Sequence, residues 1–206
     1  MKRLIKILAV LFVLAPASLR AQDTPRFEPY FGYSVLKVNL PDKIDGQDTG
    51  FIQSAVGNLL GWNGGVTIRV KGKLGAVADF AGYYRKFEGA FDGDNVSASA
   101  NLHSYLFGPR FSGTGERFRP FAQALFGVGR IGGSATLDSD KATLKGNSGF
   151  AASFGGGADI SVNKKVAIRT SLDFFPVKQS NEDINNGKSL TLSNFRFGTG
   201  IVFRLK

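Results

Sequence analysis

The residue types that could carry catalysis are few in this chain, and their spacing is wrong for it. His103 is the single histidine of the 206 residues, and there is no cysteine. A histidine close to Ser104 could activate the hydroxyl for acyl transfer. Neighbouring residues of a strand, however, point to opposite faces, so this pair alone cannot form a dyad. We therefore expect no catalytic chemistry.

Nucleotide and metal sites are equally poorly supported. Gly127, Gly129 and Gly132 spell G-x-G-x-x-G after an apolar run, but a polar loop follows where the dinucleotide motif needs a helix. The aspartates at 42, 45 and 48 lack the spacing of a calcium loop. One histidine cannot build a multi-histidine metal centre. We expect no cofactor and no metal.

Charged residues placed singly within alternating apolar stretches point to a different chemistry. Arginine and carboxylate side chains recur on the polar face of successive stretches, together with Gln123. Buried charges must pair and hydrogen-bond, because an isolated ion is costly to desolvate. Four arginines among four carboxylates therefore predict an ion-pair network: Glu28, Arg69, Asp79, Arg110, Asp159, Arg169, Asp173 and Arg196.

The stretch Trp62–Tyr84 shows how such charges would be positioned. It predicts two strands joined by a tight turn at Lys71–Lys73, with every second residue small or apolar. The opposite face carries Arg69 and Asp79, which we expect to lie side by side across the hairpin. A soluble sandwich would turn that face to water, whereas a membrane barrel would turn it inward.

The same alternation predicts eight strands and a chain without convincing helical periodicity. The many glycines (27) and phenylalanines (19) fit an all-β protein rich in turns. The predicted strands are 27–39, 62–70, 74–84, 100–111, 120–129, 149–162, 166–175 and 192–205.

The connections between these strands alternate in length. Long polar loops are predicted at 40–61, 85–99, 130–148 and 176–191, and short links at 71–73, 112–119 and 163–165. Long loops at one end and short turns at the other are typical of outer-membrane barrels. The sequence therefore predicts an all-β, eight-stranded antiparallel up-and-down transmembrane β-barrel with long extracellular loops and short periplasmic turns.

Aromatic residues and basic residues support this orientation. Two groups of aromatics, at the loop ends and at the turn ends of the strands, predict the girdles at the two membrane interfaces. The loop-end group comprises Trp62, Tyr83, Tyr84, Phe174, Phe175, Phe195 and Phe197. The net charge is +10, and basic residues recur on the short turns, at Lys71, Lys73, Arg117, Arg119, Lys164 and Lys165. A basic rim near anionic lipid explains these residues better than nucleic-acid binding.

The first 21 residues predict a secretory signal peptide. Lys2, Arg3 and Lys6 precede an apolar run from Ile7 to Leu14, and small residues follow. The run is too short for a spanning helix, which needs about 20 residues. We expect cleavage after Ala21, or alternatively after Ala17, and a single barrel domain over residues 22–206.

Seven stretches together resemble the OmpA-like (OmpX-like) family of eight-stranded outer-membrane β-barrels. The stretches are FGYSVL, GWNGGVTIRV, LGAVADFAGYY, LFGPRF, PFAQALFGVG, FGGGADI and FRFGTGIVFRL, and the resemblance extends over essentially all of residues 22–206. The resemblance implies placement in the bacterial outer membrane and insertion by the barrel-assembly machinery. Gly200, Phe203 and Leu205 are similar to the signal read by that machinery, although the chain ends in Lys206 and not in an aromatic residue.

The expected role is structural or surface-interacting. A monomeric barrel would contact outer-membrane lipid, present four loops to surface ligands and hold a lumen filled by the ion-pair network. Two alternatives remain open: a narrow low-conductance pore whose network opens transiently, and a soluble lipocalin-like binder of apolar ligands. The lipocalin-like alternative requires Arg69 and Asp79 to face water.

Overall fold

A computed structural model describes the chain over residues 27–39, 43–44, 47–48, 57–91, 94–137, 140–179 and 190–205. The expected signal peptide and both cleavage positions lie outside these residues. In the part of the chain so described, no helix is long and apolar enough to cross a membrane.

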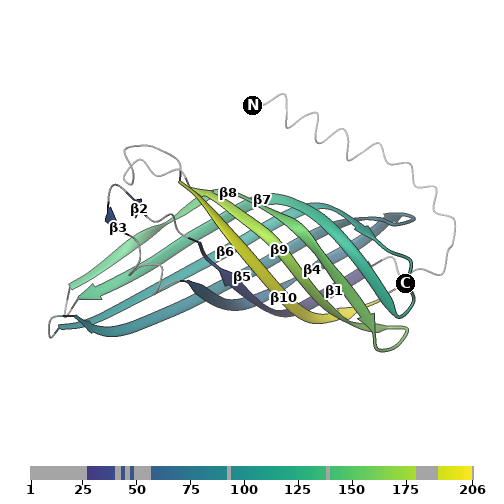
Figure 1. The fold of residues 1–206 in the computed structure, drawn as a ribbon, viewed down its shortest axis with the longest axis horizontal. Helices are drawn as coiled ribbons and strands as arrows, with labels where there is room; N and C mark the ends of the chain where they lie inside the picture. Colours follow the sequence, from purple (N-terminus) through teal and green to yellow (C-terminus); the bar gives the residue numbers. More distant parts are fainter. Residues whose placement is uncertain are drawn as a thin grey trace, which may run out of the picture.

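Eight long strands close into one antiparallel barrel (Figure 1). In spatial order they are β1, β10, β9, β8, β7, β6, β5 and β4, and β1 closes the ring because it pairs with both β10 and β4. The predicted eight-stranded antiparallel barrel is therefore confirmed. The strands are β1 (Phe27–Lys37), β4 (Asn58–Lys71), β5 (Leu74–Phe91), β6 (Asp94–Ser112), β7 (Phe118–Leu137), β8 (Asp140–Ser161), β9 (Val166–Gln179) and β10 (Leu190–Phe203). Two short strands, β2 (Lys43–Ile44) and β3 (Gln47–Asp48), pair outside the barrel.

Three short connections gather at one end of the barrel, which we call the turn end. They join β4 to β5, β6 to β7 and β8 to β9, as predicted. Gly72 lies in the first of them with φ of 55°, a left-handed conformation that favours glycine. Leu205 pairs with Phe27 at the same end. We call the opposite end the loop end.

Two of the predicted long loops are wrong. Residues 85–91 and 94–99 continue β5 and β6, which pair as far as Phe91 and Asp94. Residues 130–137 and 140–148 likewise continue β7 and β8. These four strands reach farther at the loop end than their neighbours (Figure 1). Sequence reasoning missed them because small polar residues support a backbone ladder without giving an apolar alternation.

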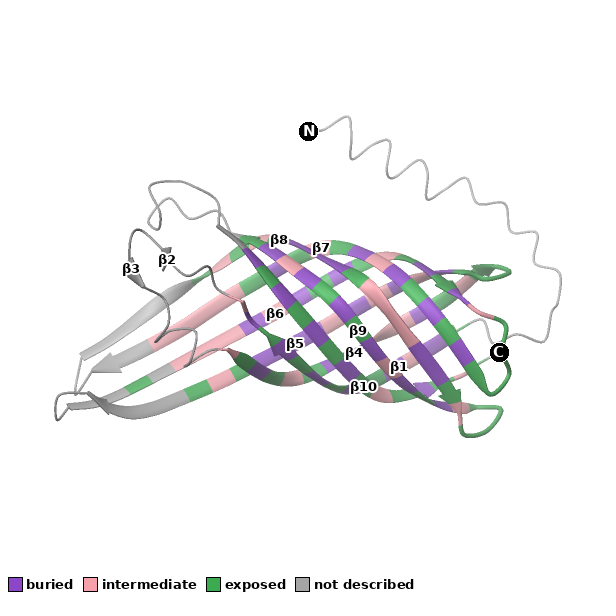
Figure 2. Ribbon diagram, viewed as in Figure 1, coloured by how far each residue is buried: buried purple, intermediate pink, exposed green. Residues whose placement is uncertain are grey.

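Exposure alternates along each strand with a period of two (Figure 2). The exposed positions are apolar, among them Phe31, Phe107, Leu172 and Ile201. The buried positions include Glu28, Asp79, Arg169 and Arg196. The charged face therefore lines the lumen and the apolar face lies outside, opposite to the facing that a lipocalin-like binder requires.

The register of the opening hairpin differs from the prediction. Arg69 pairs with Gly75, and Asp79 pairs with Gly65, so the two charged residues do not lie side by side. The turn at Gly72 and an irregularity between Arg69 and Lys71 set this register. Spacing alone could not determine it, since one residue more or less in a turn displaces every cross-strand pair.

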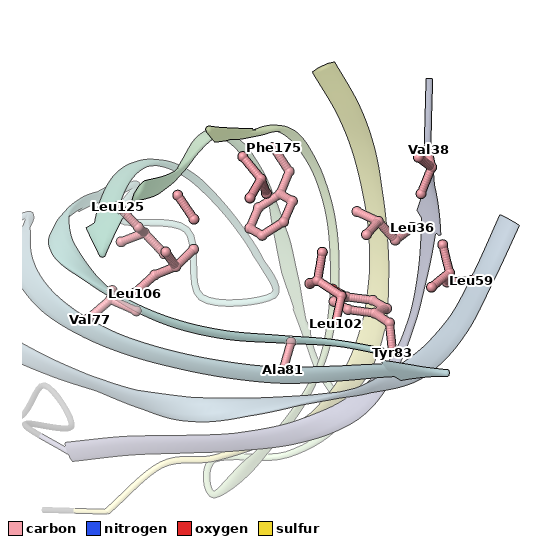
Figure 3. Packing of buried hydrophobic residues seen from close by; sticks show 12 residues of the cluster. Leu36, Val38, Leu59, Val77, Ala81, Tyr83, Leu102, Leu106, Leu125 and Phe175 are labelled. Carbon is pink, nitrogen blue, oxygen red and sulfur yellow. The ribbon is translucent and has the colours of Figure 1, made fainter. Parts of the chain in front are cut away.

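An apolar cluster occupies part of the lumen and reaches the loop end (Figure 3). Leu36 and Leu59 lie beside the connection between β1 and β4, and Val38 donates its backbone N–H to the carbonyl of Gly57. Tyr83 and Phe175 belong to this cluster and are fully buried. Their assignment to an interfacial girdle is therefore wrong, because both have the inward parity of their strands.

Candidate functional site: a charged network across the lumen

The charged side chains of the lumen come from every barrel strand and lie on its inward positions. Alternation in each strand delivers one or two polar side chains to the interior, where no bulk water solvates them. Glycine and serine fill many of the remaining inward positions. At Gly155, an added Cβ would overlap the backbone carbonyl oxygen of Leu172 and lie 2.6 Å from Asp173 Oδ1, so a larger residue would clash with the neighbouring strand as well as with that carboxylate.

Arg196 of β10 is the centre of the first group of contacts. Its Nη1 donates to Asp79 Oδ1 at 2.6 Å, and its Nε and Nη2 donate to Asp173 Oδ2 at 3.2 and 3.1 Å. Nη2 also lies 3.3 Å from Ser153 Oγ. The hydroxyl of Tyr30 donates to the other oxygen of Asp79. One guanidinium thus joins two buried carboxylates from different strands.

Arg110 of β6 bonds to neutral acceptors and not to a carboxylate. Its Nε and Nη2 lie 3.1 and 2.5 Å from Gln123 Oε1, and its Nη1 lies 3.0 Å from Thr67 Oγ1. Gln123 Nε2 in turn donates to Asp173 Oδ1 at 3.0 Å. Gln123 therefore links Arg110 to the Arg196 group, and the expected direct ion pair of Arg110 is replaced by this relay.

A second group of ion pairs lies toward the turn end. Arg119 of β7 donates through Nη2 to Glu28 Oε1 at 2.7 Å and to Asp159 Oδ2 at 3.0 Å. Arg169 of β9 holds the same aspartate through Nε at 2.7 Å and Nη2 at 3.0 Å. Arg69 Nη2 approaches Glu28 Oε1 at 3.6 Å. Two carboxylates thus lie among three guanidinium groups.

Several of these contacts cross the barrel. In the strand order, β1 and β7 are four positions apart in a ring of eight, so the Arg119–Glu28 pair joins opposite walls. Arg196–Asp79 joins β10 to β5, three positions apart around the ring, whereas Arg110–Thr67 joins β6 to β4 past the single intervening strand β5. An eight-stranded lumen is only wide enough for its own side chains. Contacts of this kind therefore cross the lumen at more than one level.

Aromatic rings cover the hydrophobic faces of the guanidinium groups. Arg110 lies 4.2 Å from the centroid of Phe121, and Arg169 lies 5.0 Å from the same ring and 4.8 Å from that of Tyr30. Stacking of this kind favours arginine over lysine, since the planar guanidinium presents a weakly hydrated face.

Sequence reasoning missed four participants: Arg119, Tyr30, Ser153 and Thr67, the last an acceptor for Arg110. The sequence places Arg119 on the basic turns, yet this residue is buried and joins two carboxylates, because β7 begins two residues earlier than predicted. Tyr30 lies an even number of residues from Glu28, and Ser153 lies an even number from Asp159, so each points to the same face as that charged residue. This spacing was the signal that could have identified them.

His103 and Ser104 point to opposite faces of β6. Ser104 is fully buried in the lumen, whereas His103 Nε2 lies 2.8 Å from the hydroxyl of Tyr84, an exposed outer residue. The two rings also meet edge to face, with centroids 5.4 Å apart. The His103 and Ser104 side chains therefore share no site.

The residues of the predicted assembly signal lie at the end of β10. Phe203 is the last residue of the strand, and Leu205 follows it, paired with Phe27. Both are about half exposed on the apolar outer face. Gly200 lies opposite Gly32 and Arg169.

Comparison with solved structures identifies the fold. Ail, the attachment invasion locus protein of Yersinia pestis, is 17% identical over 88% of this chain and 99% of its own, with a TM-score of 0.60. Its complex with the heparin analogue sucrose octasulfate is 16% identical over 88% of this chain and 99% of its own, with a TM-score of 0.57. The outer membrane protein OprG from Pseudomonas aeruginosa is 14% identical over 88% of this chain and 96% of its own, with a TM-score of 0.47. No protein-family model and no curated protein matches the sequence.

Proposed function

We propose that this chain, which has the fold of the eight-stranded outer-membrane β-barrels, is an integral outer-membrane protein with a structural or surface-interacting role. Its short turns face the periplasm and its loop end faces outward. The proposal includes no catalytic step.

The observation that carries the proposal is the inverted distribution of polarity. Large apolar side chains are exposed on all eight barrel strands. Examples are Phe31 on β1, which is 59% exposed, and Phe203 on β10, which is 47% exposed. Arg196 and Asp79, in contrast, are 1% exposed inside the barrel. In water, the exposed apolar side chains would cost about 25 cal/mol for each Å² of apolar surface left in contact with water. The buried charges would add a separate cost of desolvation. Lipid around the barrel removes the first cost, and pairing in the lumen offsets the second.

We further propose that the lumen is closed by the charged network. The cross-lumen contacts and the apolar cluster leave the narrow pore as the less favoured alternative, since ions would have to break buried ion pairs to pass. The test is conductance across a planar bilayer, with an inserted barrel of known closed lumen as the control. Steady unitary currents from this protein, where the control gives none, would overturn this part of the proposal.

The surface role is supported by the projecting strands β5, β6, β7 and β8. They extend the barrel wall at the loop end and form a platform that the other four strands do not match (Figure 1). Ail binds a heparin analogue in one of its structures. At 16% identity we take from this only that the fold can present a binding surface, and we assign no ligand.

Assembly follows from the same placement. Gly200, Phe203 and Leu205 would form the signal that the barrel-assembly machinery reads, and the barrel would be a monomer. Replacing Phe203 and Leu205 by serine should slow insertion by that machinery in proteoliposomes while leaving refolding in detergent unchanged. Equal effects in both assays would contradict a recognition role.

The deciding experiment is gel migration before and after boiling. Membranes extracted in mild detergent should yield a compact, fast-migrating form that slows when boiled, because a closed barrel resists unfolding by the gel detergent at room temperature. Release of the protein without detergent, with no shift on boiling, would exclude an integral membrane barrel.

A further inference from the structure

A cluster of arginine side chains surrounds the lumen at the turn end. We call it the mouth cluster, and it comprises Arg69, Arg119, Arg169 and Arg204 around the carboxylates of Glu28 and Asp159. Four guanidinium groups face two carboxylates, which leaves two positive charges of the cluster without a counter-charge among the described residues. The neighbouring turns add exposed cations at Arg117, Lys164 and Lys165, while Glu116 is the exposed acid of the same region.

Buried N–H groups of the mouth cluster lack acceptors among the described residues. They are Nε of Arg119, Nη1 of Arg169, and Nε and Nη2 of Arg204. Arg119 and Arg169 are only 6% and 4% exposed. A buried donor without an acceptor costs roughly 1–3 kcal/mol, and more when it is charged. An acceptor with several oxygen atoms would relieve this cost.

The strand register brings the donors of Arg119 and Arg204 close together. Arg119 lies directly opposite Asp159 on the neighbouring strand. Arg204 Nη1 donates to Ser161 Oγ at 2.8 Å, and Ser161 follows Asp159 on the same face of β8. Two residues along a strand span about 6.6 Å. Arg119 and Arg204 thus contact positions two residues apart on one face of β8, and one tetrahedral oxyanion could bridge their guanidinium groups.

Arg204 also provides the route of entry. It follows the end of β10 and is partly exposed at the mouth, and Arg69 lies on the same side. Its one hydrogen bond to Ser161 leaves most of its guanidinium free. Because Arg204 is partly exposed while its unpaired Nε and Nη2 are buried, a ligand at the turn end would reach these donors by displacing the Arg204 side chain.

We propose that the mouth cluster binds a phosphate group. Phosphate matches the planar, forked guanidinium geometry, and as a dianion it would balance the two uncompensated charges. The ligand is either free inorganic phosphate or the phosphomonoester of a lipid headgroup at the membrane surface. The site stands on the lumen contacts and is independent of the surface role proposed above.

The test uses the folded barrel in a phosphorus-free maltoside micelle. Inorganic phosphate is titrated at constant ionic strength, balanced with chloride, while the Nε–Hε resonances of the arginine side chains are followed by NMR. The variant R204Q removes a donor that holds no carboxylate, and R117Q, in an exposed turn, is the matched control. Retained migration shifts on boiling show that both variants are folded.

Saturable shifts at Arg119 and Arg204 in the parent and in R117Q, with at least tenfold weaker binding in R204Q, would support the site. A second arm replaces inorganic phosphate with short-chain phosphatidic acid, using the matching diacylglycerol as control. Saturation in this arm alone would assign the site to a lipid headgroup. Saturation in neither arm, an equal response to chloride, or equal binding by R204Q and R117Q would overturn the proposal.

Discussion

At the scale of single residues, Arg196 is the side chain on which the interior most depends. It is 1% exposed and donates to two carboxylates that come from different strands. Removing one member of a buried ion pair leaves an uncompensated charge, which is costlier than never having built the pair. The stability of the interior therefore depends on the central position of Arg196 more than on the number of ion pairs.

The substitution Arg196→Gln should therefore destabilise the barrel by about 3–5 kcal/mol, because Asp79 and Asp173 would remain buried without their common donor. Urea unfolding in lipid vesicles measures the loss. Arg117→Gln, in the exposed turn, should change stability by no more than about 0.5 kcal/mol. Adding Asp79→Asn and Asp173→Asn to the first variant should restore much of the stability, and a triple variant as unstable as the single one would argue against charge as the cause.

At the scale of elements, the three tight turns decide which cross-strand pairs form. The β4–β5 turn places Arg69 beside Gly75, so its guanidinium meets Glu28 of the other neighbouring strand instead of Asp79. Gly72 makes this turn possible through its positive φ, and an added Cβ there would meet nothing within 4 Å. Any penalty for a side chain at Gly72 is thus conformational and not steric crowding by the rest of the protein.

Gly72→Ala should accordingly cost roughly 1–2 kcal/mol, the usual penalty for an L-residue in the left-handed region. Gly72→Asn should cost less, because asparagine tolerates that conformation. Equilibrium unfolding of both variants in the same vesicles provides the measurement. If alanine and asparagine destabilised the barrel equally, backbone strain at this turn would not be the explanation.

At the scale of the whole molecule, the outer surface is suited to lipid. Leu172 lies midway along β9 and is 59% exposed, next to the exposed Phe197 of β10. In water such a position would accept almost any polar residue. Within a bilayer an arginine at the midplane costs about 2–4 kcal/mol.

Leu172→Arg should therefore lower the free energy of unfolding in lipid vesicles by about 2–4 kcal/mol. Thr114→Arg, in the exposed turn between β6 and β7, is the control and should change it by no more than about 0.5 kcal/mol. A neutral outcome at Leu172 would mean that this face is in contact with water, and the membrane placement would then fail.

Much of this organisation was accessible from the sequence because a strand has a simple period. Alternation separated the faces of Phe31, Asp79, Leu172 and Arg196 correctly, and eight alternating runs with loops of unequal length favoured a membrane barrel with its charged face inside, which the burial of these residues confirms. Local rules of this kind need no knowledge of distant residues.

The partners of the lumen side chains were decided only by the tertiary structure. Arg119 reaches Glu28 across 91 residues of sequence, and Arg110 selects Gln123 and Thr67 although four carboxylates line the same lumen. The continuation of β5 through β8 beyond the predicted strands was likewise invisible to an apolar pattern. Sequence alternation determines which way a side chain points, whereas the register and closure of the barrel determine what it meets, because both depend on turns and pairings far away along the chain.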